Sequence, residues 1–70
     1  MPEYTVFNEQ GEQLYIRITQ GMALGYYIMN NNGDILAIGR DYYDMDEAKA
    51  SAERRARTAD PADIYLPRPS

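Results

Sequence analysis

The sequence predicts an α+β fold in which a four-stranded antiparallel sheet, made of two hairpins, carries one C-terminal helix on one face. Apolar and polar side chains alternate through residues 14–18, which is the pattern of a half-buried strand. The pair Asn32–Gly33 lies between two further strand-like runs and favours a tight hairpin turn. Alanines then recur at helical spacing between residues 48 and 59.

The first hairpin is expected within residues 4–19. Residues 4–7 form its first strand, and residues 14–18 form its second strand, with one apolar face. The polar segment NEQGEQ between them supplies the turn, because Gly11 can adopt a positive φ without steric cost.

The second hairpin is expected around Asn32 and Gly33. If these two residues form a two-residue turn, the expected pairs are Tyr26 with Gly39, Ile28 with Ala37, and Met29 with Leu36. One face then carries Tyr26, Ile28, Ile35 and Ala37, and the other carries Tyr27, Met29, Leu36 and Ile38. Because both faces are apolar, we expect both to be covered.

The helix is expected between Asp44 and Pro61. Asp44 and Glu47 have the spacing of a capping box. A narrow stripe at helical spacing allows close approach to the sheet, and it consists of Met45, Ala48, Ala52, Ala56 and Ala59. The basic cluster of the chain consists of Arg54, Arg55 and Arg57, and we interpret it as a solvated helix face.

The chain beyond the helix is expected to be extended. Residues 64–66 can form a short fifth strand at an edge of the sheet, and Pro67 and Pro69 would stop its pairing. We therefore assign residues 1–60 to a single ββββα domain and residues 61–70 to an extended C-terminal tail or edge strand. We see no internal repeat and no second domain.

The composition argues against enzymatic chemistry. The chain has no cysteine and no histidine, so it lacks disulfides, the commonest general base and the commonest metal ligand. The segment DYYDMDE does not have the spacing of a calcium-binding loop. We predict no catalytic residues, no metal site and no cofactor, and we do not expect an enzyme. A domain this small without disulfides often gains stability by association, so we expect a homodimer.

The charge is unevenly distributed along the chain. The net charge is −4, and residues 1–47 hold eight acids and two bases, whereas residues 48–70 hold five bases and three acids. Nucleic-acid binders are usually basic, so we do not expect direct nucleic-acid binding. No run approaches the roughly 20 apolar residues of a membrane-spanning helix, and MPEYTVFNEQ lacks the features of a signal peptide. We expect no membrane partner and a cytoplasmic location.

The candidate partner-binding residues lie in the segment GRDYYDMDEAK. Asp44 and Glu47 have a structural explanation at the start of the helix. The two tyrosines of this segment do not, and we expect one to pack under the helix and the other to point outward. An exposed tyrosine beside carboxylates suits protein binding, because tyrosine is enriched at interface hot spots. The predicted partner-binding residues are Asp41, Tyr42, Tyr43 and Asp46.

The segment NGDILAIGRDYYDMDEAKASAERRA resembles the hairpin-to-helix part of small bacterial YegP-like domains. The matching positions are Asn32, Gly33, Ile35, Leu36, Ala37, Tyr42 or Tyr43, and Ala48. The segment TQGMALGYY departs from the spacing of that family. The family lacks a well-defined activity, so the resemblance implies a hairpin–helix fold and no particular chemistry. In size, acidity and lack of catalytic groups, the chain is also similar in type to small phage-encoded inhibitors of host defence, including anti-CRISPR proteins.

These observations favour a non-enzymatic protein-binding module that occupies a basic surface on a larger partner. In its sharpest form, the hypothesis is a phage-type inhibitor that competes with nucleic acid for that surface. Two alternatives stay open. One is a homodimeric YegP-like domain of housekeeping or unknown role, and the other is a small nucleic-acid binder that uses the arginines of the helix.

Overall fold

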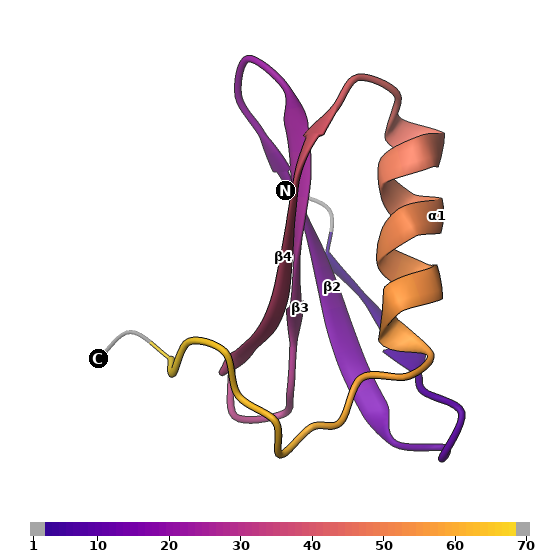
Figure 1. Ribbon diagram of the computed structural model, residues 1–70, viewed down its shortest axis with the longest axis vertical. Helices are drawn as coiled ribbons and strands as arrows, with labels where there is room; N and C mark the ends of the chain where they lie inside the picture. The colour runs from indigo at the N-terminus through magenta and orange to yellow at the C-terminus, as the bar shows by residue number, and fades with distance from the viewer. Residues whose placement is uncertain (1–2, 69–70) are drawn as a thin grey trace.

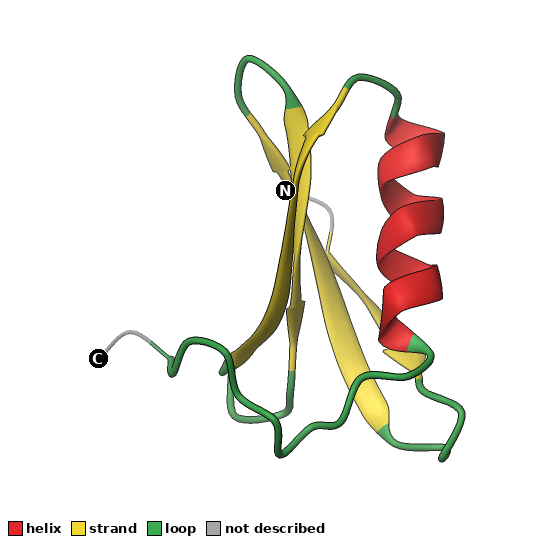
Figure 2. Ribbon diagram, in the orientation of Figure 1, coloured by secondary structure: helices red, strands yellow, loops and turns green. Residues whose placement is uncertain are grey.

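A computed structural model describes residues 3–68 and confirms the predicted α+β class. The elements are β1 (Glu3–Phe7), β2 (Gln13–Gln20), β3 (Leu24–Met29), β4 (Ile35–Tyr42) and α1 (Met45–Ala56). The strands form one antiparallel sheet in the order β1-β2-β3-β4. Figure 1 shows α1 lying across one face of this sheet, and Figure 2 shows the same view by secondary structure.

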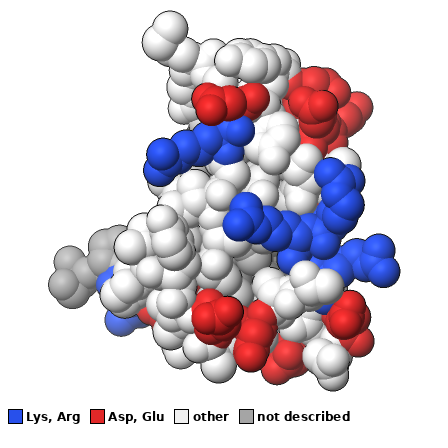
Figure 3. All heavy atoms as spheres, in the orientation of Figure 1, with Lys and Arg blue, Asp and Glu red and all other residues white. Residues whose placement is uncertain are grey.

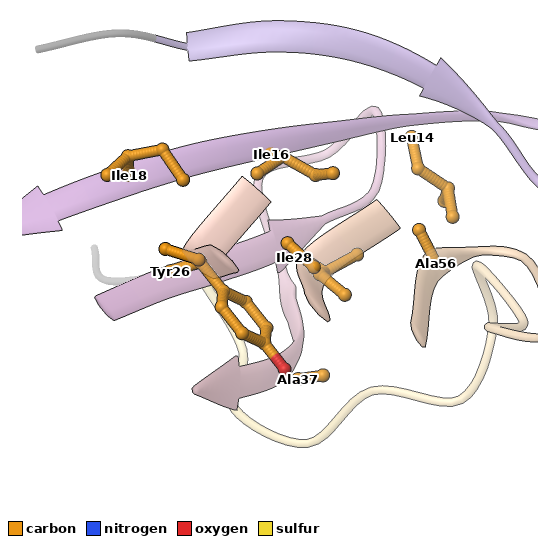
Figure 4. Close-up of a cluster of buried hydrophobic side chains, with 9 residues drawn as sticks. Leu14, Ile16, Ile18, Tyr26, Ile28, Ala37 and Ala56 are labelled. Carbon is orange, nitrogen blue, oxygen red and sulfur yellow. The ribbon is translucent and has the colours of Figure 1, made fainter. Parts of the chain in front are cut away.

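The core lies between α1 and the two central strands (Figure 4). Its large, fully buried side chains are Leu14, Ile16, Ile18, Tyr26 and Ile28. The helix contributes three buried alanines, Ala48, Ala52 and Ala56, which confirms the predicted stripe. Because these helix side chains are small, β2 and β3 supply most of the volume of the core.

The helix starts without the predicted capping box. Asp44 is the N-cap residue and has an extended backbone, but its side chain makes no cap hydrogen bond. The helix also ends at Ala56, earlier than the stripe suggested. Ala59 lies beyond the helix and still packs against the core.

A β-bulge shifts the start of β4 relative to β3. Ile28 pairs with Ala37 as predicted, but Met29 pairs with Ile35, which leaves Leu36 as the extra residue of the bulge. The predicted pairing of Met29 with Leu36 is therefore wrong. Leu36 packs against the core on the helix side, and Ile35 shares the opposite face with Met29. The predicted faces of these two residues are thus exchanged.

The two hairpins close with the same kind of turn, which begins at Asn8 in one and at Asn30 in the other. In each turn the asparagine N–H donates to a backbone oxygen four residues later, namely Asn8 N to Glu12 O at 3.0 Å and Asn30 N to Asp34 O at 3.1 Å. Gly11 and Gly33 take positive φ values of 78° and 83° in these turns. The second hairpin therefore has a three-residue loop with a left-handed glycine, and not the predicted two-residue turn.

The side chains of the two asparagines also bond alike. Each Oδ1 accepts two backbone N–H groups, from Gln10 and Glu12 at 3.0 and 2.8 Å and from Asn32 and Asp34 at 2.9 and 3.0 Å. Asn8 Nδ2 donates to Ala59 O at 2.8 Å, and Asn30 Nδ2 donates to Pro61 O at 2.8 Å. The chain thus contains a repeated turn that sequence analysis missed, and both copies hold the segment after α1.

Residues 64–66 were predicted to form a short fifth strand, and the structure has a shorter pairing there. Within the described residues the tail meets β4 in one isolated antiparallel bridge between Leu66 and Ile35, and Tyr65 N also donates to Ile35 O at 2.9 Å. Arg68 N then donates to Asp34 Oδ1 at 2.8 Å, and Pro69 lies outside the described residues. Figure 1 shows the tail crossing from the end of α1 to the edge of β4.

Candidate protein-binding site

The predicted partner-binding residues lie at the junction of β4 and α1, at one end of the molecule. Leu24 pairs with Tyr42, which places the β2–β3 loop beside this junction. Figure 1 shows both connections at the end of the molecule opposite the two asparagine turns. One surface is therefore built from two separate parts of the chain.

Asp41 sits in a second β-bulge and has a strained backbone. The register shift between Leu24 and Tyr26 leaves Gly25 opposite two residues, Arg40 and Asp41. The φ of Asp41 is 68°, and within residues 3–68 it is the one non-glycine residue with a positive φ. Aspartate tolerates this region better than most residues, but the conformation still costs free energy. The Asp41 side chain is exposed.

The bulge brings β3 and β4 close together at Gly25. A Cβ on this residue would lie 2.7 Å from Gly39 O and 2.8 Å from Thr19 Oγ1. Only glycine fits such an approach without movement of the backbone. The bulge and the exposure of Asp41 thus depend on this glycine.

One of the two tyrosines in this segment packs against the core and the other is exposed, as predicted. The ring of Tyr42 lies 5.8 Å from the ring of Tyr26, centroid to centroid, and packs against the core. The Tyr43 side chain is 81% exposed. Tyr43 is therefore available to a partner, and Tyr42 supports the junction from beneath.

Met22, in the β2–β3 loop, is a candidate residue that sequence analysis missed. It is 104% exposed relative to the reference state for methionine. A shallow hollow of about 410 Å³ lies between its loop and β4, and it is lined by Thr19, Met22, Ala23, Leu24, Gly25, Arg40, Asp41 and Tyr43. A methionine side chain adapts well to irregular partner surfaces. The signal for this residue is an apolar side chain at a glycine-flanked hairpin tip.

Asp41 lines the hollow with Met22 and Tyr43, beside Arg40, and further carboxylates follow at the start of α1. Asp41, Asp44, Asp46 and Glu47 are all exposed, and Asp46 and Glu47 lie in the first turn of α1. Figure 3 shows acidic side chains gathered over the start of α1 and basic ones over its later turns. Within residues 3–68 the one ion pair joins Arg17 to Glu3, so none of these carboxylates takes part in an ion pair. We call the surface made of Met22, Asp41, Tyr43, Asp44, Asp46 and Glu47 the acidic end.

The basic cluster is exposed, as predicted, and one of its three arginines also makes hydrogen bonds to the sheet. Arg55 Nη1 donates to the Tyr26 hydroxyl at 3.3 Å and to Ile38 O at 3.2 Å. Arg55 therefore reaches from the helix to the outer edge of β4. Arg54 and Arg57 are exposed, as expected of a solvated face.

One tyrosine hydroxyl among the described residues has a raised pKa, and it lies away from the acidic end. Residues 3–68 contain no group of three or more His, Cys, Asp or Glu side chains that could hold a metal ion. The pKa of the Tyr4 hydroxyl is raised, first by burial and then by its 2.8 Å hydrogen bond to Glu53 Oε2 and the charge of that carboxylate. This pair joins β1 to α1 and lies outside the acidic end. None of the described helices is long and apolar enough to span a membrane.

No protein-family model matches the chain, and neither a curated protein nor a solved structure matches it. Its function is therefore argued from its own surface.

Proposed function

We propose that the chain is a non-enzymatic protein-binding module whose acidic end occupies a basic surface on a larger protein. The observation that carries this proposal is the exposure of Met22 and Tyr43, at 104% and 81%, on either side of one hollow. The exposed Asp41 lines the same hollow, and three further exposed carboxylates follow at the start of α1. Apolar or aromatic anchors inside a polar rim are the usual arrangement of an interface.

Two further features support the proposal. A strained residue such as Asp41 persists only where its surroundings hold it, and such residues cluster at functional sites. The Asp44 carboxylate makes no cap hydrogen bond, so its charge is available to a partner. A complementary partner surface would be basic, because opposite charges across an interface speed association and select the partner.

In its sharpest form, the proposal is a phage-type inhibitor that competes with nucleic acid. Proteins that bind nucleic acid present lysine and arginine to the phosphates. The acidic end offers four exposed carboxylates to such side chains. A module of this kind needs no catalytic group, because it acts by covering the surface that nucleic acid would use.

Capture from bacterial lysate with matched variants tests the proposal. The acidic-end variant is Asp41→Asn with Asp46→Lys, since asparagine also tolerates a positive φ. The control is Glu9→Gln with Asp63→Lys, which changes the net charge equally, using exposed residues of the β1–β2 turn and the tail. We expect the wild type and the control to capture the same protein and the acidic-end variant to lose it.

Competition completes this test. Nucleic acid added to the lysate should release the captured protein from the wild-type chain, because both would occupy one surface. A protein that the acidic-end variant retains, or that both variants lose equally, contradicts the proposed site. A protein that depends on the acidic end but withstands nucleic acid contradicts the inhibitor form alone.

A second candidate is self-association through the sheet face away from α1. Tyr15, Tyr27 and Ile38 are half-buried on this face, and Phe7 is 61% exposed. Contiguous apolar surface of this kind usually marks an interface. Sedimentation at micromolar concentration should then give twice the 8.0 kDa monomer mass, and Tyr27→Glu should return the chain to a monomer. A strict monomer for the wild type contradicts this candidate.

A further inference from the structure

The outer side of β4 is open along much of its length. β4 is an edge strand of the sheet, and the tail pairs with it only at Ile35 within the described residues. Ile38 also faces outward, because Arg55 reaches its carbonyl oxygen from outside the sheet. The N–H and C=O of one residue in an antiparallel strand point to the same side, so Ile38 N–H faces outward as well. Nothing outside the sheet in residues 3–68 accepts a backbone hydrogen bond from it.

A groove of about 470 Å³ follows this open edge. It is lined by Leu36, Ala37, Ile38, Arg40, Arg55 and Tyr65. Ala37 on β4 is small, and Arg55 is the residue of α1 that lines the groove. Neither Arg40 nor Arg55 forms an ion pair within the described part of the chain. The groove thus joins an apolar strand edge to two positive charges.

We propose that this groove binds an extended acidic segment of another protein, which adds to the sheet as a strand beside β4. The tail shows that the edge accepts such pairing, because Ile35 N donates to Leu66 O at 2.7 Å and Ile35 O accepts Leu66 N at 3.0 Å. Backbone hydrogen bonds supply affinity in strand addition, and pockets for alternate side chains supply specificity.

The charge of the groove selects the occupant. Every second side chain of an added strand points to the helix side of the sheet. A Glu or Asp carboxylate there would meet Arg55, and one on the opposite side of the added strand would meet Arg40, which shares the face of Ile38 away from α1. Guanidinium–carboxylate pairs are among the stronger hydrogen bonds in proteins. A basic segment would be repelled locally. A nucleic-acid strand could use the guanidinium groups and the outward N–H of Ile38, but it lacks the regular alternation of backbone donors and acceptors with which a peptide strand pairs along β4.

Arg55 covers part of this edge in the free protein. Its hydrogen bonds to Ile38 O and to the Tyr26 hydroxyl, at 3.2 and 3.3 Å, are long compared with the usual 2.9–3.0 Å of an N–H···O bond. An incoming carboxylate offers a charged acceptor in their place and frees the Ile38 carbonyl for pairing. Ile38 and Arg55 lie outside the acidic end, whereas Arg40 also lines the hollow beside Met22 and Tyr43. The Ile38 variants therefore test this site independently of the proposed function.

Peptide selection tests the site with a defined probe. A displayed library of random twelve-residue peptides is selected against the folded chain, and the enriched peptides are synthesised. We expect Asp or Glu to be enriched in them. Peptide binding should fall about tenfold or more for Ile38→Pro, because this change removes the outward backbone donor. It should fall by a similar factor for the double variant Arg40→Gln with Arg55→Gln, because that change removes the charged contacts. Arg40→Gln alone should show a smaller loss if the double variant does not fold.

Two matched controls distinguish loss of the backbone donor or of the groove charges from loss of the folded structure. Ile38→Ala shortens the same side chain but keeps the N–H, and Arg54→Gln removes a helix charge outside the groove. Arg54→Gln should bind the peptides like the wild type, and Ile38→Ala, which alters the lining but keeps the donor, should bind them clearly better than Ile38→Pro. Hydrogen exchange at Ile38 N–H should slow when peptide is added. Absence of enrichment, equal binding to Ile38→Pro and Ile38→Ala, or binding of a twelve-nucleotide single strand in place of peptides overturns the proposal.

Discussion

Asn8 and Asn30 hold the two hairpins and the segment after α1 with corresponding hydrogen bonds. Each side chain is 6% exposed, accepts two N–H groups of its own turn, and donates to a carbonyl beyond the helix. The two turns and the start of the tail are thus fixed together at one end of the molecule. The acidic end lies at the other end, where loops meet without such clamps.

Replacement of either asparagine by alanine should destabilise the fold to a similar extent. Asn8→Ala and Asn30→Ala each leave two turn N–H groups and one tail carbonyl without their partner. The free energy of unfolding should fall by about 1–3 kcal/mol for each variant in urea denaturation. Asn31→Ala, at an exposed position of the same turn, is the control and should unfold like the wild type. Equal stability of all three variants would contradict the clamping role.

Gly39→Ala should destabilise the core because the ring of Tyr26 lies over this glycine. A Cβ at residue 39 would lie 2.6 Å from Tyr26 Cδ2 and closer still to two other ring atoms. Overpacking of this kind costs about 1–3 kcal/mol. Gly21→Ala is the control, since its Cβ would come no closer than 3.9 Å to Ala23 O. Thermal unfolding that is unchanged in Gly39→Ala would show that the ring does not occupy this place.

The Tyr4–Glu53 pair predicts a specific alkaline instability. The pKa of the Tyr4 hydroxyl is raised in the folded chain, so its protonated form is favoured there. Above pH about 10 the unfolded chain loses this proton while the folded chain keeps it, and stability therefore falls as pH rises. Urea denaturation between pH 9 and about 11.5 should show a steeper loss for the wild type than for Tyr4→Phe. Parallel curves for the two proteins would contradict this coupling.

Asp41 offers a way to separate stability from binding. Glycine has no steric penalty at a positive φ, so Asp41→Gly should raise the free energy of unfolding by up to about 1 kcal/mol, less the entropy that glycine loses on folding. The same change removes a carboxylate from the acidic end and should weaken binding of the captured protein. Asp41→Asn removes the charge without the gain in stability. Wild-type affinity in both variants would exclude Asp41 from the interface.

The fold was predictable because local patterns and packing agree in this chain. Alternation around Ile16 predicted a half-buried strand, and the alanine stripe predicted a helix close to the sheet. The pairing near Ile35 was not predictable, because a bulge at Leu36 exchanges the faces of both residues without any glycine or proline signal. The two turns share a local pattern, an asparagine followed three residues later by a glycine, but their hold on the tail depends on tertiary hydrogen bonds that the sequence does not show.

The candidate site was predictable in part. The acidic segment at the end of β4 identified Asp41 and Tyr43 as exposed groups that a structural role does not explain. Met22 was missed because its place beside Tyr43 depends on the pairing of Leu24 with Tyr42, which is a contact between distant parts of the sequence. Arg55 was assigned to a solvated face because helical spacing does not reveal its reach to the neighbouring strand edge.

The association rate of the captured partner tests the account most directly. Surface plasmon resonance at low salt should compare the wild type with Asp41→Asn plus Asp46→Lys and with the equally charged control, Glu9→Gln plus Asp63→Lys. We predict that the acidic-end variant associates about tenfold more slowly or worse, that the control stays near the wild type, and that Tyr43→Ala speeds dissociation. The contrary result is that the acidic-end variant associates as fast as the wild type while Arg54→Glu plus Arg57→Glu abolishes binding. The partner would then be anionic, which contradicts the proposed function.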